Sequence, residues 1–416
     1  GGPVNTHAPG PASYPSLSSG EVIVPALALR IDRVEANIAE MALYCSRVGV
    51  GLAPHVKTTL SIDVARMQLE SGAWGMTAAN LAQAEMLIRA GSRRIIIANQ
   101  IVQDRELDWL LQVRQGEPEL EILTLVDSVA SVDALARAAA RAPGGRPLRA
   151  LVEVGQSGGR AGVRTLAEGL EVARRVSEAP GVELAGVECF EGATGESTLD
   201  RSLASVSRLL ELVAQLAGEI DRLGLVGRSA PPLCTAGGSA YFDRVVADLT
   251  AALPQGWQIV LRSGCYVTHD HGLYADRTPS TRDATAPQLR AALGLWARVL
   301  SIAEPGLAIV GFGRRDAGSD AGMPIPLTTH RGEVVIDLVG HATCTALNDQ
   351  HAYISFSQAH VDLQVADLVE FGISHPCTTI DKWSEILVVD DQSRVIDTLK
   401  TERNQRFRPL DPPGMR

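Results

Sequence analysis

The sequence lacks a long apolar run, a paired-cysteine motif and an excess of positive charge, and each absence excludes a class of protein. No stretch reaches the roughly 18 consecutive apolar residues that a membrane-spanning helix needs. The six cysteines include no CxxC spacing, which favours the reducing cytoplasm over a disulfide framework. The 38 Lys and Arg residues are outnumbered by 48 Asp and Glu. The resulting net charge of −10 argues against a nucleic acid or an anionic membrane as the main partner.

The composition is otherwise that of an ordinary globular protein, on a chain longer than one core usually supports. Of its 416 residues, 45% are hydrophobic and 21% are charged. This length predicts one large domain and a second one. Residues 1–20 are rich in Gly, Pro and Ser and contain no apolar signal core, so we expect a flexible N-terminal arm and a cytoplasmic protein.

Short apolar segments alternate with segments of helical period from about residue 50 to residue 264. Eight such strands separated by helices indicate a parallel α/β fold, a (β/α)₈ barrel of the TIM type over residues 31–264. A doubly wound open sheet is the alternative. The predicted strands are 51–57, 73–78, 94–99, 121–126, 148–154, 182–190, 232–235 and 258–262. The predicted helices include 32–48, 61–71, 81–90, 131–142, 165–177 and 202–223.

The pattern changes after residue 265, where turn-rich segments replace the helical period. Short strand patterns there indicate a mainly β domain that follows the barrel. The strand-like segment 22–30 precedes the barrel, and we expect it to join this domain, which would then comprise residues 21–30 and 265–416 and carry a metal site. Its predicted strands are 295–300, 307–311, 333–339, 352–355, 368–371 and 386–389.

The first predicted barrel strand ends in a single lysine, Lys57. An ammonium at the tip of a buried strand loses hydration, and desolvation lowers its pKa towards that of a reactive amine. In a parallel barrel that tip points into the face that carries the chemistry, where a lysine suits a Schiff base. The alternative is a lysine that ends a strand and extends into solvent.

Glycine turns follow the seventh and eighth predicted strands, where barrels commonly hold a phosphate group. Because the predicted lysine lies on the same face, the combination resembles a pyridoxal 5'-phosphate site. An ordinary chain turn is the alternative interpretation. The candidate cofactor-binding residues are Thr235, Gly237, Gly238 and Ser239 in the first turn and Gly264, Cys265 and Tyr266 in the second.

An arginine, Arg160, follows the fifth predicted strand. At that depth a guanidinium can pair with the phenolate oxygen of the cofactor. Capping of the next helix or bonding to loop carbonyls would explain the residue equally well.

Imidazole and thiol groups stand two positions apart at His375 and Cys377. In an extended segment such positions face the same side, and this ligand pair favours Zn²⁺, with Mn²⁺ or Mg²⁺ possible. An HxC spacing can also arise by coincidence. We predict His351 as a further ligand, an orienting residue or a proton carrier. Residues 269–271 and 341–344 also contain ligand-type side chains, which turns or core packing explain more simply.

These motifs together resemble the D-threonine aldolase / D-serine dehydratase family, which has the fold-type III pyridoxal phosphate architecture shared with alanine racemase. The resemblance covers about residues 22–390. It implies that Lys57 holds the cofactor, that Arg160 contacts its ring oxygen and that His375 and Cys377 bind a divalent metal. The motifs are residues 54–58, 72–79, 82–85, 160–163, 237–239, 262–267, 349–351 and 375–377.

Two departures from the family pattern stand out. Phe190 replaces a tyrosine that commonly ends the sixth strand, and phenylalanine cannot donate a hydrogen bond. Residues 348–351 replace a more acidic run, which leaves the role of Asp349 open.

The resemblance implies a lyase that acts on a small-molecule substrate, a β-hydroxy-D-amino acid, and the D configuration rests on the resemblance alone. In this family a His-x-Cys pair accompanies dehydratases more often and His-x-Asp accompanies aldolases. We therefore predict dehydration and deamination of a D-serine or D-threonine type substrate to a 2-oxo acid and ammonia. Retro-aldol cleavage to glycine and an aldehyde is the first alternative, and a racemase or a non-catalytic cofactor carrier are others. We expect a homodimer.

Overall fold

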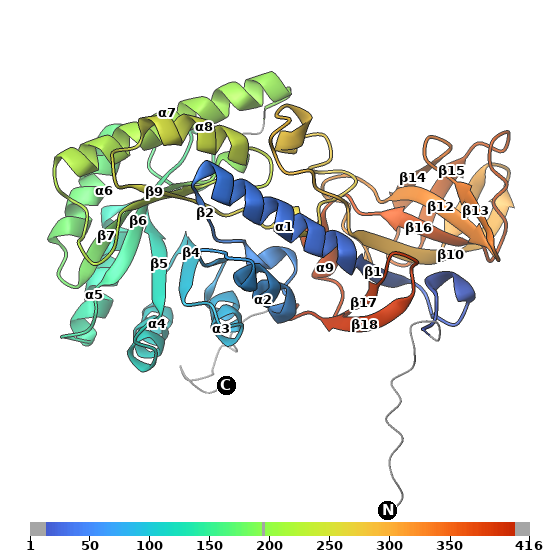
Figure 1. Ribbon diagram of the computed structural model, residues 1–416, viewed down its shortest axis with the longest axis horizontal. Helices are drawn as coiled ribbons and strands as arrows, with labels where there is room; N and C mark the ends of the chain where they lie inside the picture. Colours follow the sequence, from blue (N-terminus) through green and yellow to red (C-terminus); the bar gives the residue numbers. More distant parts are fainter. Residues whose placement is uncertain (1–13, 194–195, 404–416) are drawn as a thin grey trace, which may run out of the picture.

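A computed structural model of the chain describes residues 14–193 and 196–403 and shows a parallel barrel beside a mainly β part (Figure 1). The eight barrel strands follow the order β2-β9-β8-β7-β6-β5-β4-β3, and every neighbouring pair is parallel. The ring closes where His55 bridges Thr77 and where the Thr77 amide donates to the Pro54 carbonyl at 2.9 Å. The predicted α/β barrel is therefore confirmed.

Strand and helix positions in the barrel follow the apolar pattern of the sequence. Strand β6 is buried along its whole length, as expected where helices cover the outer face of a parallel sheet. The strands are β2 (Gly51–Leu52), β3 (Met76–Ala78), β4 (Arg94–Gln100), β5 (Glu121–Val126), β6 (Leu148–Val154), β7 (Val182–Cys189), β8 (Leu233–Ala236) and β9 (Gln258–Leu261). The helices are α1 (Ile31–Val48), α2 (Ile62–Glu70), α3 (Leu81–Arg89), α4 (Asp104–Gly116), α5 (Val129–Arg141), α6 (Leu166–Glu178), α7 (Leu199–Arg222) and α8 (Phe242–Ala252).

The first barrel strand is shorter than the sequence pattern predicts. Strand β2 ends at Leu52, and Lys57 lies in a short 3₁₀ helix, Val56–Thr58. Pro54 has no amide hydrogen to donate to a neighbouring strand, which explains the early end of the ladder. The prediction that Lys57 terminates the strand is corrected: the lysine lies in the turn just beyond it, still at the carboxyl end of the barrel.

The second part of the fold is built from β strands around a ten-stranded sheet. Strand β1 (Ala26–Arg30), which precedes the barrel, pairs antiparallel with β10 and parallel with β17, as the sequence predicts for segment 22–30. The remaining elements are β10 (Leu293–Glu304), β11 (Leu307–Val310), β12 (Ile325–Arg331), β13 (Val334–Asp337), β14 (Ala342–Leu347), β15 (Ala352–Phe356), β16 (Leu368–Gly372), α9 (Pro376–Ile380), β17 (Glu385–Val389) and β18 (Val395–Lys400).

Of the predicted N-terminal arm, residues 1–13 lie outside the described residues, as do residues 404–416 of the predicted β domain. The described end of the arm forms a 3₁₀ turn, Leu17–Ser19. Leu17 is buried, and its amide donates to the Ser393 carbonyl at 2.9 Å, so this turn is attached to the β part.

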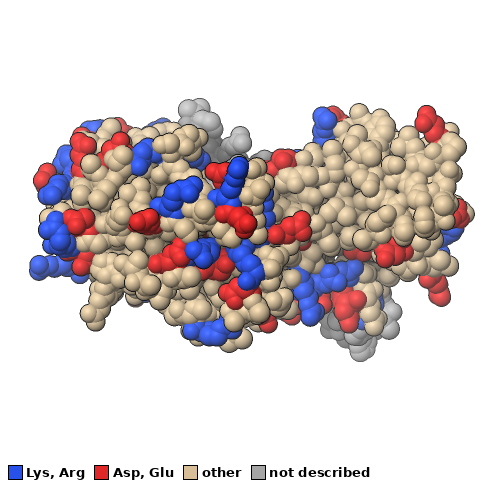
Figure 2. Space-filling model, turned by 90° about the horizontal axis from the view of Figure 1, so that it is seen from above, with Lys and Arg blue, Asp and Glu red and all other residues tan. Residues whose placement is uncertain are grey.

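The surface carries charges of both signs. On the face seen in Figure 2, Lys and Arg side chains alternate with Asp and Glu over the barrel, and fewer charges lie over the β part. Among the described residues no helix combines the length and apolar character that a membrane crossing requires.

Candidate active site

The predicted site residues approach one another from the barrel mouth and from α9, which lies between the two parts of the molecule (Figure 1). The Cys377 thiol on α9 donates to Thr58 Oγ1 at 3.5 Å, and Thr58 is the residue after Lys57. The structure therefore brings the predicted metal pair and the turn of the predicted cofactor lysine together.

Lys57 is exposed at the barrel mouth rather than desolvated, so the burial expected from the sequence is not seen. Its turn is stabilised by His55, whose Nδ1 accepts the Lys57 backbone amide at 3.3 Å. Burial lowers the pKa of His55 well below its ordinary value, and the cationic groups of Lys57, Arg262 and Arg160 act in the same direction. His55 is thus a neutral ring at neutral pH, next to an amine that is open to a ligand.

The glycine turn after β8 already surrounds a carboxylate. The amides of Gly237 and Gly238 donate to the two oxygens of buried Glu191, at 3.1 and 2.6 Å. Gly237 has a φ of +93°, which glycine adopts without strain. The two amides converge on one anion, as in a phosphate cradle, but Glu191 holds them both. A phosphate here would therefore bind through Ser239 and the second turn. Glu191 carries no signal in the sequence pattern and was not among the predicted site residues.

The second turn packs directly on the lysine turn. A Cβ on Gly264 would lie 2.6 Å from the His55 carbonyl oxygen, so only glycine fits. The Cys265 thiol points to Cys377, at 3.4 Å between the sulfurs. The Tyr266 hydroxyl accepts a hydrogen bond from Gln68 of α2 at 2.9 Å and is buried. Of the predicted ligands in this turn, Cys265 and Tyr266 can thus offer a phosphate only their backbone.

A buried ion pair crosses the barrel mouth, and the sequence analysis did not select it. Arg262 donates to Glu188 Oε1 at 2.5 Å and to Thr235 Oγ1 at 2.9 Å, with both charged side chains almost inaccessible. Thr235 is therefore occupied by Arg262. Burial raises the pKa of Glu188 to about 8, Arg262 opposes this rise, and Glu153 adds to it.

Removal of Glu188 is expected to destabilise the fold, because the buried guanidinium of Arg262 would lose the carboxyl oxygen that accepts its hydrogen bond. We expect Glu188→Ala to lower the free energy of unfolding by about 3–5 kcal/mol. Denaturant unfolding followed by circular dichroism measures the change. The control is Glu219→Ala, which removes an exposed pair with Arg222 and should leave the midpoint nearly unchanged. Equal midpoints for both variants would contradict the prediction.

Arg160 lies over Phe190, with its guanidinium carbon 5.0 Å from the ring centroid. This is within the range of a cation–π contact. Both residues line a small cavity of about 30 Å³ together with Glu153 and Gly155. The aromatic ring at the position where the family has tyrosine therefore supports the arginine, although it cannot replace the missing hydroxyl.

The predicted metal pair lies at the start of a helix, although an extended segment was expected. His375 is the N-cap of α9, and Cys377 is its second residue because Pro376 begins the helix. The two side chains nevertheless meet: a hydrogen bond with Cys377 raises the pKa of His375 to about 9. Bonds from Cys265 and His375 hold the pKa of Cys377 well below its ordinary value.

The donor set fits a divalent ion. Asp320 Oδ2 lies 2.6 Å from His375 Nδ1, and such a carboxylate orients a metal-binding imidazole from behind. Nitrogen and thiolate sulfur are ligands that zinc prefers. Among the described residues no three His, Cys, Asp or Glu side chains form a ready cage, so the pair would leave positions for water or substrate. Asp320 was not selected from the sequence.

His351 was predicted as a further ligand, an orienting residue or a proton carrier. His351 is exposed at the tip between β14 and β15, and its backbone carbonyl accepts the Asn348 amide at 2.8 Å. Within residues 269–271, Asp270 accepts the amides of Gly272 and Tyr274, as the turn interpretation predicts.

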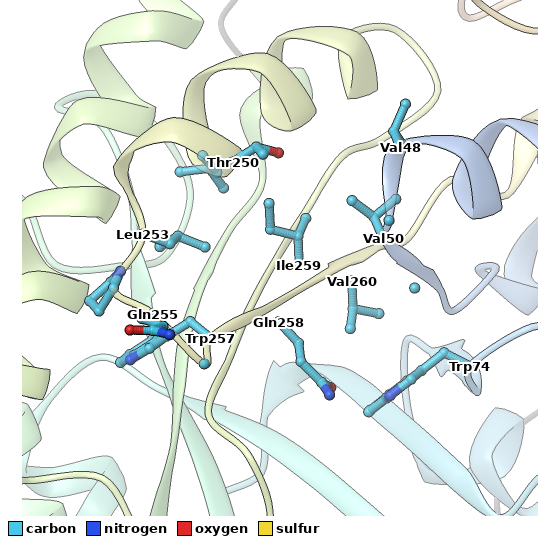
Figure 3. Close-up of a pocket in the computed structure, with 15 residues that line it drawn as sticks. Val48, Val50, Trp74, Thr250, Leu253, Gln255, Trp257, Gln258, Ile259 and Val260 are labelled. Atoms are coloured by element: carbon cyan, nitrogen blue, oxygen red, sulfur yellow. The ribbon is translucent and has the colours of Figure 1, made fainter.

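A larger pocket of about 490 Å³ lies at the opposite end of the barrel (Figure 3). Val50, Trp74 and Gln258 line it near the amino ends of the strands. Barrel enzymes place their chemistry at the carboxyl ends, so this pocket is not the candidate site.

Comparison with known proteins agrees with this architecture. The alanine racemase N-terminal domain matches residues 29–230, and the putative serine dehydratase domain matches residues 292–389. A 3-hydroxy-D-aspartate aldolase of Paracoccus denitrificans (strain Pd 1222) is 27% identical over 316 residues, 75% of this chain and 77% of that protein. A D-threo-3-hydroxyaspartate dehydratase of Delftia sp. (strain HT23) is 28% identical over 368 residues, covering 85% and 91%.

Solved structures share the whole fold. D-threonine aldolase from Filomicrobium marinum superposes with a TM-score of 0.76 at 23% identity, over 91% of this chain and 95% of that one. A D-threo-3-hydroxyaspartate dehydratase variant with a cysteine changed to alanine, described as metal-free, has a TM-score of 0.74 at 22% identity, over 94% and 99%. Another variant of that dehydratase has alanine in place of a histidine two positions before this cysteine.

The barrel, the added β part and the two domain matches define an alanine racemase-like enzyme of the fold-type III class. Within that class the domain matches and relatives are those of the D-threonine aldolase / D-serine dehydratase family, which this chain resembles and whose members are pyridoxal phosphate-dependent lyases. The resemblance seen in the sequence motifs is thereby confirmed.

Proposed function

We propose that the chain is a pyridoxal phosphate- and divalent metal-dependent lyase that converts β-hydroxy-D-amino acids to 2-oxo acids and ammonia. The observation that carries the proposal is the contact between Cys377 and Thr58 at 3.5 Å, which sets a metal pair beside the lysine turn. A substrate whose amino group is near Lys57 then has its β-hydroxyl within reach of the pair. The relatives named for aldolase or dehydratase activity on 3-hydroxyaspartate support this substrate class.

Different residues at the barrel mouth would bind different parts of the cofactor. When bound, pyridoxal phosphate supplies an electron sink for charge at the α-carbon. Lys57 offers the amine for attachment, and once free it can accept the α-proton. Arg160, supported by Phe190, offers its guanidinium to the ring oxygen. The turns at Ser239 and Gly264 offer backbone amides to the phosphate.

His375 and Cys377 would hold the divalent ion, Zn²⁺ by preference for this donor set and Mn²⁺ or Mg²⁺ otherwise. An ion held there supplies Lewis-acid chemistry at the substrate's hydroxyl. Asp320 keeps the imidazole in one orientation through the 2.6 Å contact to Nδ1. The related dehydratase offers a parallel: its substituted histidine and cysteine have the same spacing, and the cysteine variant is described as metal-free.

Aldol cleavage is the second candidate, because the relatives include aldolases as well as a dehydratase. It needs a base for the β-hydroxyl rather than an acid that lets it leave. The predicted base, His351, is exposed in the turn between β14 and β15. The homodimer stays part of the proposal, with residues 31–264 forming the barrel domain and 21–30 with 265–416 the β domain.

The products distinguish the candidate reactions. We expect D-serine, D-threonine and 3-hydroxy-D-aspartate, each incubated with cofactor and zinc, to yield a 2-oxo acid and ammonia in equal amounts. The matching L-amino acids should yield neither. Glycine with an aldehyde (glyoxylate in the case of 3-hydroxy-D-aspartate) and no ammonia would reverse the choice in favour of the aldolase, and interconversion of D and L forms would identify a racemase. Chromatography of the products with an ammonia assay measures all three outcomes.

A further inference from the structure

Three side chains form a closed triangle between the predicted cofactor and metal sites. Thr58 Oγ1 lies 3.7 Å from the Cys265 sulfur and 3.5 Å from the Cys377 sulfur, and the two sulfurs are 3.4 Å apart. Each of the three residues belongs to a different part of the proposed site. Thr58 follows the cofactor lysine, Cys265 lies in the second phosphate turn, and Cys377 is a metal ligand.

The triangle changes its hydrogen bonding when Cys377 binds a metal. A ligand cysteine is a thiolate and has no proton to donate. Thr58 and Cys265 must then both donate to its sulfur. The Tyr274 side chain is hydrogen-bonded to Cys265, so its hydroxyl can donate to the Cys265 sulfur when the Cys265 thiol donates to Cys377. The ligand sulfur is thus fixed by donors from two cofactor-binding turns.

The packing leaves these turns little freedom to move separately. A Cβ on Gly264, which precedes Cys265, would lie 2.8 Å from Thr58 Oγ1. Cys265 is almost fully buried. A phosphate that orders the second turn therefore also orders the thiol that supports the metal ligand.

We propose that Cys265 is a positioning residue that couples metal binding to cofactor binding. The inference rests on the proposed function, because it assumes that both groups bind at these turns. Its consequence is that each group raises the affinity for the other by one common factor, as thermodynamic linkage requires. Outer residues of this kind typically change metal affinity by about 10–100-fold.

The test measures zinc affinity with a competing chelating dye, in cofactor-free and cofactor-loaded protein. For the native chain we expect tighter zinc binding after loading, by roughly 5-fold or more. Cys265→Ala should bind zinc about 10-fold more weakly when loaded, and the gain on loading should fall towards one. Cys265→Ser keeps a donor and should recover most of both effects. Cys344→Ala, a buried cysteine of β14, is the matched control and should behave as the native chain.

The outcomes separate this inference from the proposed function. If the native chain takes up pyridoxal phosphate and zinc but shows the same zinc affinity with and without cofactor, the coupling is refuted. The role of Cys265 is also refuted if Cys265→Ala and Cys344→Ala behave alike. If the native chain takes up no cofactor at all, the proposed function itself fails. Circular dichroism identifies a variant that is merely unfolded, in which case Cys265→Ser and Thr58→Val decide the question.

Discussion

Lys57→Ala should abolish fixation of pyridoxal phosphate to the chain by borohydride and should lower turnover on the order of 10³-fold or more. The turn is stabilised by the hydrogen bond from the Lys57 backbone amide to His55, and this bond does not involve the Lys57 side chain. The amine itself is exposed at the barrel mouth. The substitution should therefore leave the fold intact. Loss of attachment and loss of the α-proton acceptor would then act together.

Few lysines make this experiment easy to interpret. Besides Lys57 the sequence contains only Lys382 and Lys400. Peptide mapping after borohydride treatment should find the cofactor on the peptide that contains Lys57. Lys400→Ala is the control and should retain full labelling and activity. A label on either of the other two lysines, or undiminished labelling of Lys57→Ala, would refute the assignment.

The order of strands was predictable because parallel strands are buried on both faces and appear as short apolar runs. The runs at 121–126 and 148–154 coincide with β5 and β6. The bounds of helices α4 and α8 were not predicted, although a helix was expected between each pair of barrel strands. Charged residues interrupt the apolar stripe of α4, which begins Asp104, Arg105 and Glu106, and α8 begins directly after the glycine turn. Local pattern alone does not show where such elements begin.

Site residues were predictable where their type and position in the sequence alone indicate a function. Lys57 and the His375/Cys377 pair are recognisable from the sequence alone. In the structure Cys377 contacts Thr58, the residue after Lys57. Residues defined by a distant partner were missed. Glu191 is recognisable only through the amides it accepts 46 residues away, and Arg262 only through Glu188, 74 residues away. Such pairings are a product of the fold and have no sequence spacing to detect.

Two local geometries were wrong for one shared reason. Lys57 was expected to end a strand, and His375 and Cys377 were expected in an extended segment. A proline lies at each place: Pro54 follows strand β2, and Pro376 is the first residue of α9. The functional side chains therefore lie on tight turns that follow extended backbone. Such turns hold their side chains in one arrangement through short-range hydrogen bonds.

Removal of His375, the proposed metal ligand, is expected to have the second large effect. His375→Ala should lose bound zinc after dialysis and should lower dehydration on the order of 10²-fold or more, because the loss of Lewis-acid assistance amounts to several kcal/mol. Treatment of the native chain with a chelator should give the same loss, and added zinc should reverse it. Zinc content by elemental analysis and ammonia release measure the two effects.

Two further variants show whether the loss of zinc and activity arises at the His375/Cys377 pair. Asp320→Asn weakens only the contact that orients the imidazole, so we expect about 10–100-fold weaker zinc binding with activity restored at high zinc. His351→Ala, at the exposed tip of the β14–β15 turn, should keep its zinc. At saturating concentration pyridoxal phosphate should still bind to all three variants, because Lys57 and the phosphate turns are unchanged. A chelated enzyme that still interconverts D and L amino acids would instead mean that the cofactor works without the ion, and the chemistry would be that of a racemase.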